Sequence, residues 1–338
     1  MRYKKVIITE FGKPDVLRII EESVLPEPRK REVRIKVLTA GAAFTDTMIR
    51  KGKYPDVKEK PPFSPGYDMV GIIDAIGEGV TEFKTGQMVA DLTVIGSYSE
   101  YICLHAHRLT PVPDGIDPVE AVSLILSYVT AYQMLHRVAK VKKKQTVLVH
   151  GAGGAVGTAM LQLGRNLDLK IYGTASKSKH DLVSELGAIP IDYKNERWPD
   201  QITQHNGDGL DAVFDPIGGA SYKKSFQILK KGGILVGYGF YNAVSGKGGS
   251  MVLDFGRIKL WNLLPNGKTT AFYSIGGLRK KKPEWFKEDL VALFKLLLEG
   301  KIKPVVGKCL PLRDAKLAHE LIEKAQVQGK LVLIIGDR

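Results

Sequence analysis

The stretch Gln145–Gly157, "QTVLVHGAGGAVG", decides the fold, because an apolar run breaks there into glycine. Residues Thr146–Val149 are β-branched or apolar, which is typical of a buried strand. Four glycines follow within seven residues, and the helix-like run "TAMLQLGRNL" comes next. Glycine lets backbone N–H groups approach a ligand, and a helix presents a positive N-terminal end to it. This order therefore predicts a site that binds a phosphate group.

The glycines fit the spacing G-x-x-G-x-x-G, whereas the dinucleotide pattern G-x-G-x-x-G would need a glycine at Val156. A tight strand–helix turn without a ligand is the alternative interpretation. The position favours a ligand, because the loop follows the first strand of a β–α series, where such sheets bind nucleotides. The residues expected to contact a pyrophosphate are Gly151, Gly154, Ala155, Val156 and Gly157.

Strands and helices alternate after this loop, which predicts a parallel sheet covered on both faces and a doubly wound topology. His150 ends the first strand, and we expect it to be packed or bonded to backbone. A long buried helix is expected over 118–140. Residues 240–268 break the alternation with the loop "SGKGGS" and a short helix. The strands are expected at 146–150, 170–174, 188–191, 211–215, 233–239 and 269–274.

The first 110 residues instead favour short strands in a loop-rich antiparallel barrel. In residues 32–40, Val33, Ile35 and Val37 alternate with basic residues, the period of a half-buried strand. Further strands are expected at 70–77, 86–92 and 99–106. The tail from 303 onward repeats strand, amphipathic helix and strand, so we expect it to rejoin the N-terminal domain. The predicted domains are 1–120 with 302–338, and 121–301.

Composition excludes several classes of protein. At 338 residues, 44% hydrophobic and 25% charged, the chain is typical of a soluble globular protein. No apolar run approaches the roughly 18 residues of a membrane span, and the apolar stretch near the start is short for a signal peptide, so we expect a cytoplasmic protein without a cleaved leader. The two cysteines match no metal spacing. The net charge of +14 suits anionic ligands, but its lysines are scattered, so nucleic acid is not the favoured partner.

The end of the second strand bears on which nucleotide binds. An NAD site needs Asp or Glu there for the ribose 2′-hydroxyl. This chain has "IYGTASKSKH", in which Ser176 is followed by Lys177 and Lys179. A carboxylate would repel a 2′-phosphate, whereas a hydroxyl and an ammonium would hold it. The strand end therefore favours NADPH, although Lys177 could instead be a solvated residue at a helix start.

Several segments resemble the medium-chain dehydrogenase/reductase superfamily, and the similarity covers essentially the whole chain. Besides the glycine loop they are "GTASKSKH", "IDYKNE", "DPIGG", "GKLVLII" and the GroES-like run "SPGYDMVGIIDAIGEGVTEFKTGQMVA". The zinc-free NADPH:quinone oxidoreductase branch is the most similar, and within it the VAT-1-like group, through "SYVTAYQML" and "KIKPVV". The resemblance implies an α/β protein with a GroES-like β-rich N-terminal domain and a Rossmann NADPH-binding domain. It also implies a homodimer through the edge strand at 269–274.

The same resemblance implies roles for individual residues. Thr130 would lie beside the nicotinamide, and Gly239 and Phe240 would line its pocket. Ser176, Lys177 and Tyr193 would hold the 2′-phosphate. The family motif x-N-x-x-D near the nicotinamide keeps Asp46, which is expected to be catalytic together with Tyr54 and Thr130, but Ala43 replaces its asparagine. Tyr54 matches a tyrosine proposed to donate a proton, and packing or ring stacking is its alternative role.

Zinc enzymes of this superfamily take ligands from a cysteine and from a G-H-E motif. Here the first segment is "GAAFTDT", without cysteine, and "GYD" puts Tyr67 in place of the histidine. We therefore expect no metal site. The expected activity is hydride transfer from NADPH to a quinone or another conjugated carbonyl, in a cleft between the domains. The alternatives are an enoyl-thioester or alkenal reductase, and a non-enzymatic NADPH- and RNA-binding protein.

Overall fold

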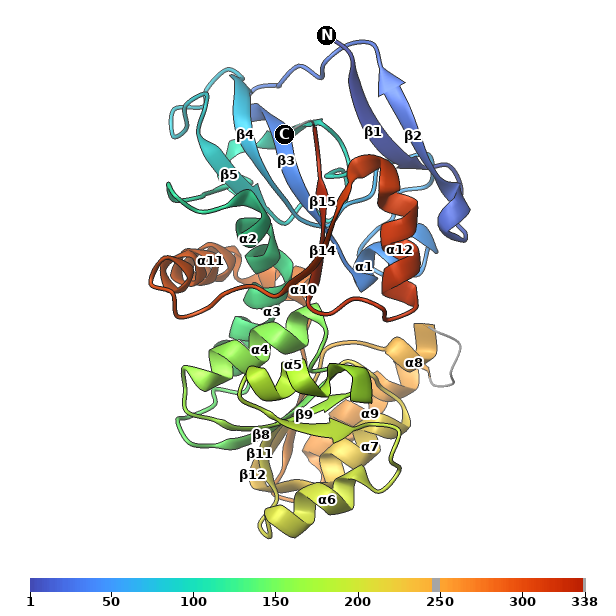
Figure 1. The fold of residues 1–338 in the computed structure, drawn as a ribbon, viewed down its shortest axis with the longest axis vertical. Coiled ribbons are helices and arrows are strands. Elements are labelled where there is room, and N and C mark those ends of the chain that lie inside the picture. Colours follow the sequence, from blue (N-terminus) through green and yellow to red (C-terminus); the bar gives the residue numbers. More distant parts are fainter. Residues whose placement is uncertain (245–249, 337–338) are drawn as a thin grey trace. The chain divides into compact units, whose positions relative to one another are not determined.

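A computed structural model describes residues 1–244 and 250–336, and its described part divides into two compact units (Figure 1). The first unit comprises Met1–Ser127 and the chain from Leu290 onward, and the second comprises Tyr128–Asp289. The expected loop "SGKGGS" lies mostly outside the described residues. The domain boundaries at 120/121 and 301/302 stay predictions.

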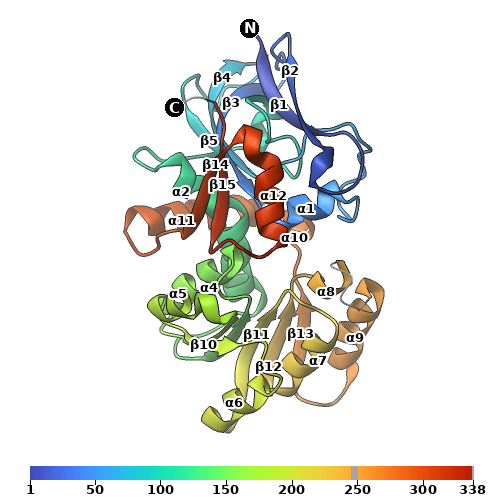
Figure 2. The same cartoon turned by 45° about the vertical axis from the view of Figure 1, so that its right-hand side comes forward.

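The second unit contains a parallel sheet of the order β10-β9-β8-β11-β12-β13. Figure 2 labels β10, β11, β12 and β13 of this sheet. Every neighbouring pair in it is parallel. The chain moves outward from β8 to β10 and then returns to β11, so the order reverses between β8 and β11. The predicted doubly wound sheet is confirmed. Its strands are β8 (Thr146–His150), β9 (Lys170–Ala175), β10 (Ile189–Asp192), β11 (Leu210–Asp215), β12 (Leu229–Gly237) and β13 (Thr269–Phe272).

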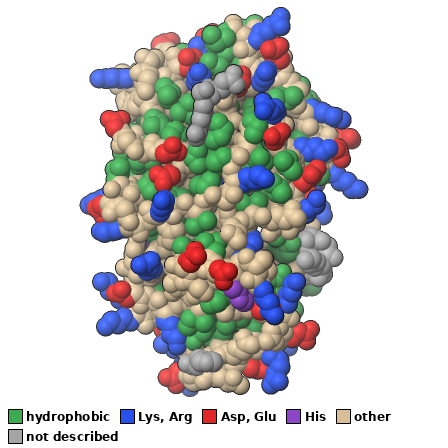
Figure 3. All heavy atoms as spheres, in the orientation of Figure 1, with side chains coloured by type: hydrophobic (Ala, Val, Ile, Leu, Met, Phe, Trp, Pro, Cys, Tyr) green, Lys and Arg blue, Asp and Glu red, His purple; other side chains and the backbone are tan. Residues whose placement is uncertain are grey.

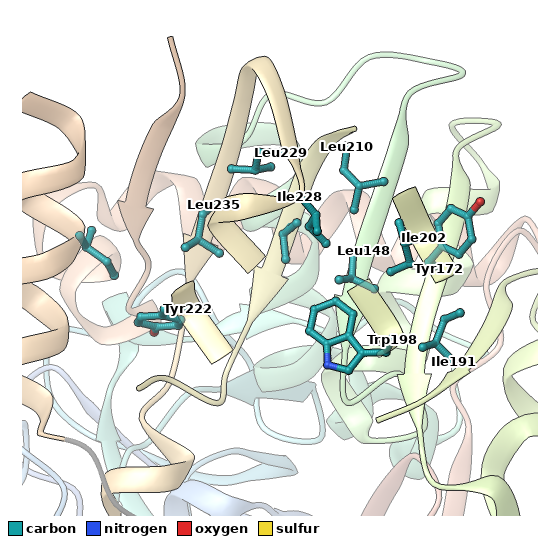
Figure 4. Packing of buried hydrophobic residues seen from close by; sticks show 12 residues of the cluster. Leu148, Tyr172, Ile191, Trp198, Ile202, Leu210, Tyr222, Ile228, Leu229 and Leu235 are labelled. Atoms are coloured by element: carbon teal, nitrogen blue, oxygen red, sulfur yellow. The ribbon is translucent and has the colours of Figure 1, made fainter. Parts of the chain in front are cut away.

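Helices follow these strands because each crossover must return to start a parallel neighbour. α4 packs against β8 and β9, whereas α6, α7 and α9 contribute side chains to a buried cluster on the sheet (Figure 4). In that cluster Trp198 lies near Leu148, and Tyr222 lies near Leu235. The helices of this unit are α4 (Ala155–Arg165), α5 (His180–Glu185), α6 (Trp198–His205), α7 (Ala220–Gln227), α8 (Tyr241–Val244), α9 (Met251–Leu263), α10 (Ile275–Lys281) and the short η5 (Lys177–Lys179).

The predicted long helix over 118–140 is present as a helical run in which α-type and π-type turns alternate. Its residues are mostly buried, as the apolar sequence predicts. The boundary between the two units falls inside this run, and α11 (Pro283–Leu298) crosses the other boundary. The segments of the run are α2 (Pro118–Ser123), η3 (Leu124–Tyr128), α3 (Val129–Tyr132) and η4 (Gln133–Val138).

The first unit has a mixed sheet of the order β14-β15-β3-β4-β5-β7, with β6 also paired to β3. β15 runs antiparallel to β3, so the tail of the chain does lie beside the N-terminal strands. β14 and β15 are parallel because α12 connects them as a crossover. The strands are β1 (Tyr3–Ile8), β2 (Leu17–Glu22), β3 (Glu32–Ala42), β4 (Met69–Ile76), β5 (Met88–Asp91), β6 (Tyr101–His105), β7 (Thr110–Pro111), β14 (Val306–Pro311) and β15 (Lys330–Ile334). The helices are α1 (Phe44–Arg50), α12 (Ala315–Glu323) and the short η1 (Pro14–Val16), η2 (Ala106–Arg108) and η6 (Leu312–Asp314).

The surface carries charge of both signs. On the face drawn in Figure 3, Lys and Arg side chains are interspersed with Asp and Glu and do not gather in one patch. Among the described helices, none combines the length and the apolar character needed to cross a membrane.

Candidate functional site

The glycine loop lies at the carboxyl end of β8, directly before α4. Gly151 has a left-handed φ of 69°, and its carbonyl accepts a hydrogen bond from the Gly154 N–H at 3.0 Å. Gly154 is the N-cap of α4 and offers no side chain to the first turn. The first hydrogen bond of α4 runs from the Thr158 N–H to the Gly154 carbonyl. The backbone N–H groups of residues 155–157 therefore have no acceptor within the helix. The loop therefore presents backbone donors and the positive end of an 11-residue helix.

Two glycines of the loop are required by close packing. A Cβ on Gly157 would lie 2.3 Å from the Gly151 carbonyl oxygen, so only glycine lets the helix start this close to the strand end. A Cβ on Gly153 would lie 2.7 Å from Cδ of Lys179. The aliphatic part of Lys179 thus passes over the loop, and burial lowers the pKa of its ammonium group. Gly153 leaves space for this lysine.

The end of β9 carries the residues predicted to select the 2′-phosphate. Ser176 is half-buried, with its hydroxyl 3.1 Å from the Ser178 hydroxyl, and Lys177 is exposed. Tyr193 follows β10, and its backbone N–H donates to the Ala175 carbonyl at 3.4 Å. The structure thus brings the ends of β9 and β10 together. Residues 174–179 on the β9 side carry no acidic side chain, whereas β10 ends in Asp192, which pairs in register with Ala175.

The residues predicted to lie at the nicotinamide are spread over other elements. Thr130 is buried in α3. Gly239 follows β12, and a Cβ there would lie 2.7 Å from the Pro216 carbonyl oxygen, so glycine lets two loops approach. The Phe240 ring stacks on Phe272 at 4.8 Å and also packs against Phe255. The side chain of Phe240 is therefore held in an aromatic cluster.

His150 is packed, as one of its two predicted roles has it: it is only 2% exposed, and both of its ring nitrogens bind side chains. Nδ1 lies 3.0 Å from the Thr174 hydroxyl, and Nε2 lies 3.0 Å from the Ser225 hydroxyl. Burial lowers the pKa of this histidine. The identity of these partners is not predictable from the local sequence, because they stand 24 and 75 positions away along the chain.

In the first unit, Tyr54 and Tyr67 form a phenol pair. Tyr54 lies in the loop after α1, and its hydroxyl is 2.5 Å from that of the fully buried Tyr67. The two rings meet edge to face with their centroids 5.6 Å apart. Burial raises the pKa of Tyr54 to about 12 and that of Tyr67 well above 10. Both phenols are therefore protonated at neutral pH.

Two buried carboxylates belong to the same unit. Asp46, in the first turn of α1, accepts the Ala43 N–H at 2.9 Å with one oxygen, and its other oxygen has no hydrogen-bond partner. Burial, and then the charge of Asp68, raise the pKa of Asp46 to about 8. Asp68 binds the Lys330 ammonium at 2.8 Å, with both side chains buried. A Cβ on Gly41 would lie 2.1 Å from Asp68 Oδ1, so glycine makes room for this ion pair.

Several of these residues were not predicted from sequence. The sequence marks Tyr67 only as the replacement of a zinc-ligating histidine and gives no indication of Lys330. Lys179, by contrast, is predicted from sequence as a lysine that follows the second strand, and Gly153 leaves space for its side chain. Among the described residues, no group of three or more His, Cys, Asp or Glu side chains could hold a metal ion.

Comparisons with known proteins agree with this architecture. Residues 29–114 match the alcohol dehydrogenase GroES-like domain, and residues 186–333 match the zinc-binding dehydrogenase domain. The chain is 31% identical to the synaptic vesicle membrane protein VAT-1 homolog of Danio rerio, over 98% of this chain and 70% of that protein. It is also 31% identical to the human quinone oxidoreductase, over 98% of both chains.

Among solved structures, the Escherichia coli quinone oxidoreductase complexed with NADPH superposes with a TM-score of 0.87 at 27% identity. The superposition covers 98% of this chain and 99% of that one. The chain is therefore an oxidoreductase that belongs to the medium-chain dehydrogenase/reductase superfamily, in its quinone oxidoreductase and VAT-1 branch.

Proposed function

We propose that this protein is an NADPH-dependent, zinc-free oxidoreductase that transfers hydride to a quinone or another conjugated carbonyl. One observation supports the proposal most directly. Backbone N–H donors at the start of α4 lie near the end of β9, where the chain carries Lys177 and Lys179 and no acidic residue between positions 174 and 179. The NADPH complex of the E. coli relative supports the same cofactor. NADPH, when bound, supplies the hydride, and the protein binds, orients and desolvates the reactants.

The second unit fits a phosphorylated dinucleotide. In the loop of Gly151, Gly154 and Gly157, the third glycine lets α4 start directly against the loop backbone, and the first two have no side chain in the way of a ligand. The N–H groups of this loop, with those of Ala155 and Val156, would take the pyrophosphate. Ser176, Lys177 and Tyr193 would hold the 2′-phosphate, and the half-buried Lys179 adds a further positive charge near the loop. Thr130, Gly239 and the backbone at Phe240 are proposed for the nicotinamide end.

The first unit supplies the candidate proton donor. Because Tyr54 remains protonated at neutral pH and is only half-buried, its phenol can donate to a bound acceptor while Tyr67 holds its oxygen in place. Asp46 is fully buried and caps α1, so we propose that it supports this region without touching the acceptor. The phenol pair favours a second candidate activity, the reduction of alkenals or enoyl thioesters, because those products need a proton.

Zinc-free chemistry is proposed from residue identities. The positions that carry cysteine and histidine ligands in zinc-dependent relatives hold Phe44 and Tyr67, and Tyr67 is engaged with Tyr54. Neither side chain is a zinc ligand of the usual kind. Elemental analysis of active protein should find no stoichiometric zinc, and activity should survive chelation. One zinc per chain, lost together with activity on chelation, would refute this part.

A homodimer through β13 is also proposed. β13 is the last strand on one side of the sheet, so its outer edge can pair with a second copy. α9 packs against β13, and four apolar side chains on one face of α9 are unusually exposed. They are Val252 (79%), Leu253 (68%), Leu260 (55%) and Leu263 (80%). A second copy would cover them, and sedimentation equilibrium should give twice the chain mass of 37.2 kDa.

The experiment that tests the activity is an NADPH-oxidation screen over quinones, alkenals and enoyl thioesters with purified protein. Turnover with at least one of these classes is expected, and NADH should support it poorly. No oxidation with any class, despite tight NADPH binding, would refute the enzymatic proposal. Salt-sensitive RNA binding in that case would favour the non-enzymatic alternative.

A further inference from the structure

Four buried polar side chains form a continuous chain at the carboxyl ends of β9, β8 and β11. The Thr174 hydroxyl is hydrogen-bonded to His150 Nδ1, and His150 Nε2 is hydrogen-bonded to the Ser225 hydroxyl on α7. The Ser225 hydroxyl in turn is hydrogen-bonded to Asp215 Oδ2 at the end of β11. The distances are 3.0, 3.0 and 2.8 Å in that order. Each of the four residues is at most 2% exposed. A buried polar group without a hydrogen-bond partner destabilises the folded state, so each donor in this hydrogen-bond chain must face an acceptor.

The hydrogen-bond donors can be assigned from the Asp215 end. Ser225 donates its hydroxyl hydrogen to Asp215 Oδ2, so its oxygen must accept from His150 Nε2–H. A neutral imidazole then accepts at Nδ1, and the Thr174 hydroxyl donates to it. The Thr174 oxygen in turn accepts the Gly151 N–H at 3.3 Å. All the donors therefore point from the glycine loop towards Asp215.

The two ends of this chain lie in loops at the carboxyl edge of the sheet. At one end is Gly151, whose left-handed φ opens the glycine loop. At the other end, Asp215 Oδ1 accepts the Ile217 N–H at 2.7 Å, and the Asp215 carbonyl accepts the Tyr238 N–H at 3.0 Å. The hydrogen bonds thus connect the loops after β8, β11 and β12 through one imidazole ring. The Trp198 ring packs nearly perpendicular to that ring, with the two centroids 5.1 Å apart.

We propose that His150 is a positioning residue: held as the Nε2–H tautomer between Ser225 and Thr174, it fixes the Gly151 N–H and hence the loop that takes the dinucleotide phosphates. The inference rests on the proposed NADPH site. The geometry of the glycine loop would then depend on His150, although His150 itself contacts neither cofactor nor substrate. Breaking this hydrogen-bond chain should weaken cofactor binding and leave the rate of hydride transfer from bound cofactor unchanged.

The structure offers a matched pair of variants. Ser225 and Ser221 both lie on α7, and both donate to Asp215 Oδ2, at 2.8 and 2.7 Å. Ser225→Ala breaks the chain, whereas Ser221→Ala removes an equivalent bond and leaves His150 connected. Thr174→Val breaks the chain at its other end and provides a second variant if Ser225→Ala does not fold.

In Ser225→Ala and Thr174→Val, KM for NADPH and its Kd should rise about tenfold, the loss expected for about 1.4 kcal/mol of loop ordering. The kcat at saturating NADPH should change less than about twofold. In Ser221→Ala both constants should stay near the wild-type values. Equal effects of Ser225→Ala and Ser221→Ala, or a fall in kcat with unchanged KM, would overturn the proposal.

Two measurements do not depend on NADPH. Nitrogen-15 NMR of the ring should show the Nε2–H tautomer in wild type and Ser221→Ala, with a changed pattern in Ser225→Ala. Hydrogen exchange at the Gly151 amide should quicken in Ser225→Ala and not in Ser221→Ala. An Nδ1–H tautomer or unchanged exchange would overturn the positioning role. Failure of wild type to bind NADPH, with these signals as expected, would refute the proposed function instead.

Discussion

Replacing Tyr54 by phenylalanine should separate the reduction of alkenes from the reduction of quinones. The substitution keeps the ring and removes the hydroxyl that lies 2.5 Å from Tyr67. If Tyr54 donates a proton, turnover on an alkenal or enoyl thioester should fall by roughly 10²- to 10⁴-fold, the range for a lost general acid. Quinone turnover should change little, because a hydroquinone anion can take its proton from water.

The same change has a structural cost that must be measured separately. The fully buried Tyr67 hydroxyl would lose its partner, which costs about 1–3 kcal/mol of unfolding free energy. Tyr67→Phe is the matched control, because it breaks the same hydrogen bond and keeps the Tyr54 phenol. Its alkene turnover should fall by no more than about tenfold, since the donor remains and only its orientation is relaxed.

The assay is steady-state NADPH oxidation with one alkenal and one quinone, alongside urea unfolding. Burial holds the pKa of Tyr54 at about 12, so this group should add no pH dependence to wild-type turnover between pH 6 and about 10. Unchanged alkenal turnover in Tyr54→Phe, with NADPH affinity intact, would refute the donor role. So would an equal loss on both acceptors, because that result indicates a packing defect.

Three further predictions concern the cofactor loop and the buried carboxylate. Lys177→Ala should raise the Kd for NADPH about tenfold or more and leave that for NADH almost unchanged, by fluorescence titration; parallel losses would argue against a 2′-phosphate contact. Gly157→Ala should lower the unfolding free energy by about 1–3 kcal/mol because its Cβ meets backbone, whereas Gly154→Ala has space and should not. The carboxyl of Asp46 has a pKa raised to about 8, so its contribution to stability is present below pH 4 and is lost as the pH rises to about 8. In Asp46→Asn the unfolding free energy measured in urea should vary less with pH across that range. An unchanged dependence of the unfolding free energy on pH would contradict the assignment.

Most of the fold was predictable because it depends on local patterns. The strand–glycine–helix order at 145–157 and the alternation after it were enough for the doubly wound sheet. The parallel β14–β15 pair is equally local, since a helix of nine residues connects its strands. By contrast, the 13-residue α9 was expected only as a short helix, because Gly256 and the neighbouring glycine-rich segment lower the helical signal.

The candidate site was predictable only in part, because its side chains meet through the fold. Lys330 and Asp68 form an ion pair although they are 262 positions apart in the sequence, and no local pattern in either segment predicts it. Tyr67 was visible as a departure from a zinc motif, but its contact with Tyr54 depends on how the loop after α1 packs. The partners of His150 cannot be predicted from its own strand, since they come from β9 and from α7.

The glycine loop itself was predictable because its requirement is steric. Gly157 must lack a Cβ for α4 to start against the Gly151 carbonyl, and this holds whatever the loop binds. Which nucleotide it binds depends instead on charge at the end of β9, where Lys177 is exposed and Lys179 is half-buried.

The most direct test of the account is a parallel titration of the wild-type protein with NADPH and NADH, followed by cofactor or protein fluorescence. The two ligands differ only in the 2′-phosphate, so the comparison isolates the lysine-flanked end of β9. We expect a Kd for NADPH at least about tenfold below that for NADH, with the difference shrinking as salt is added. Equal affinities for the two cofactors, or tighter binding of NADH, would contradict it.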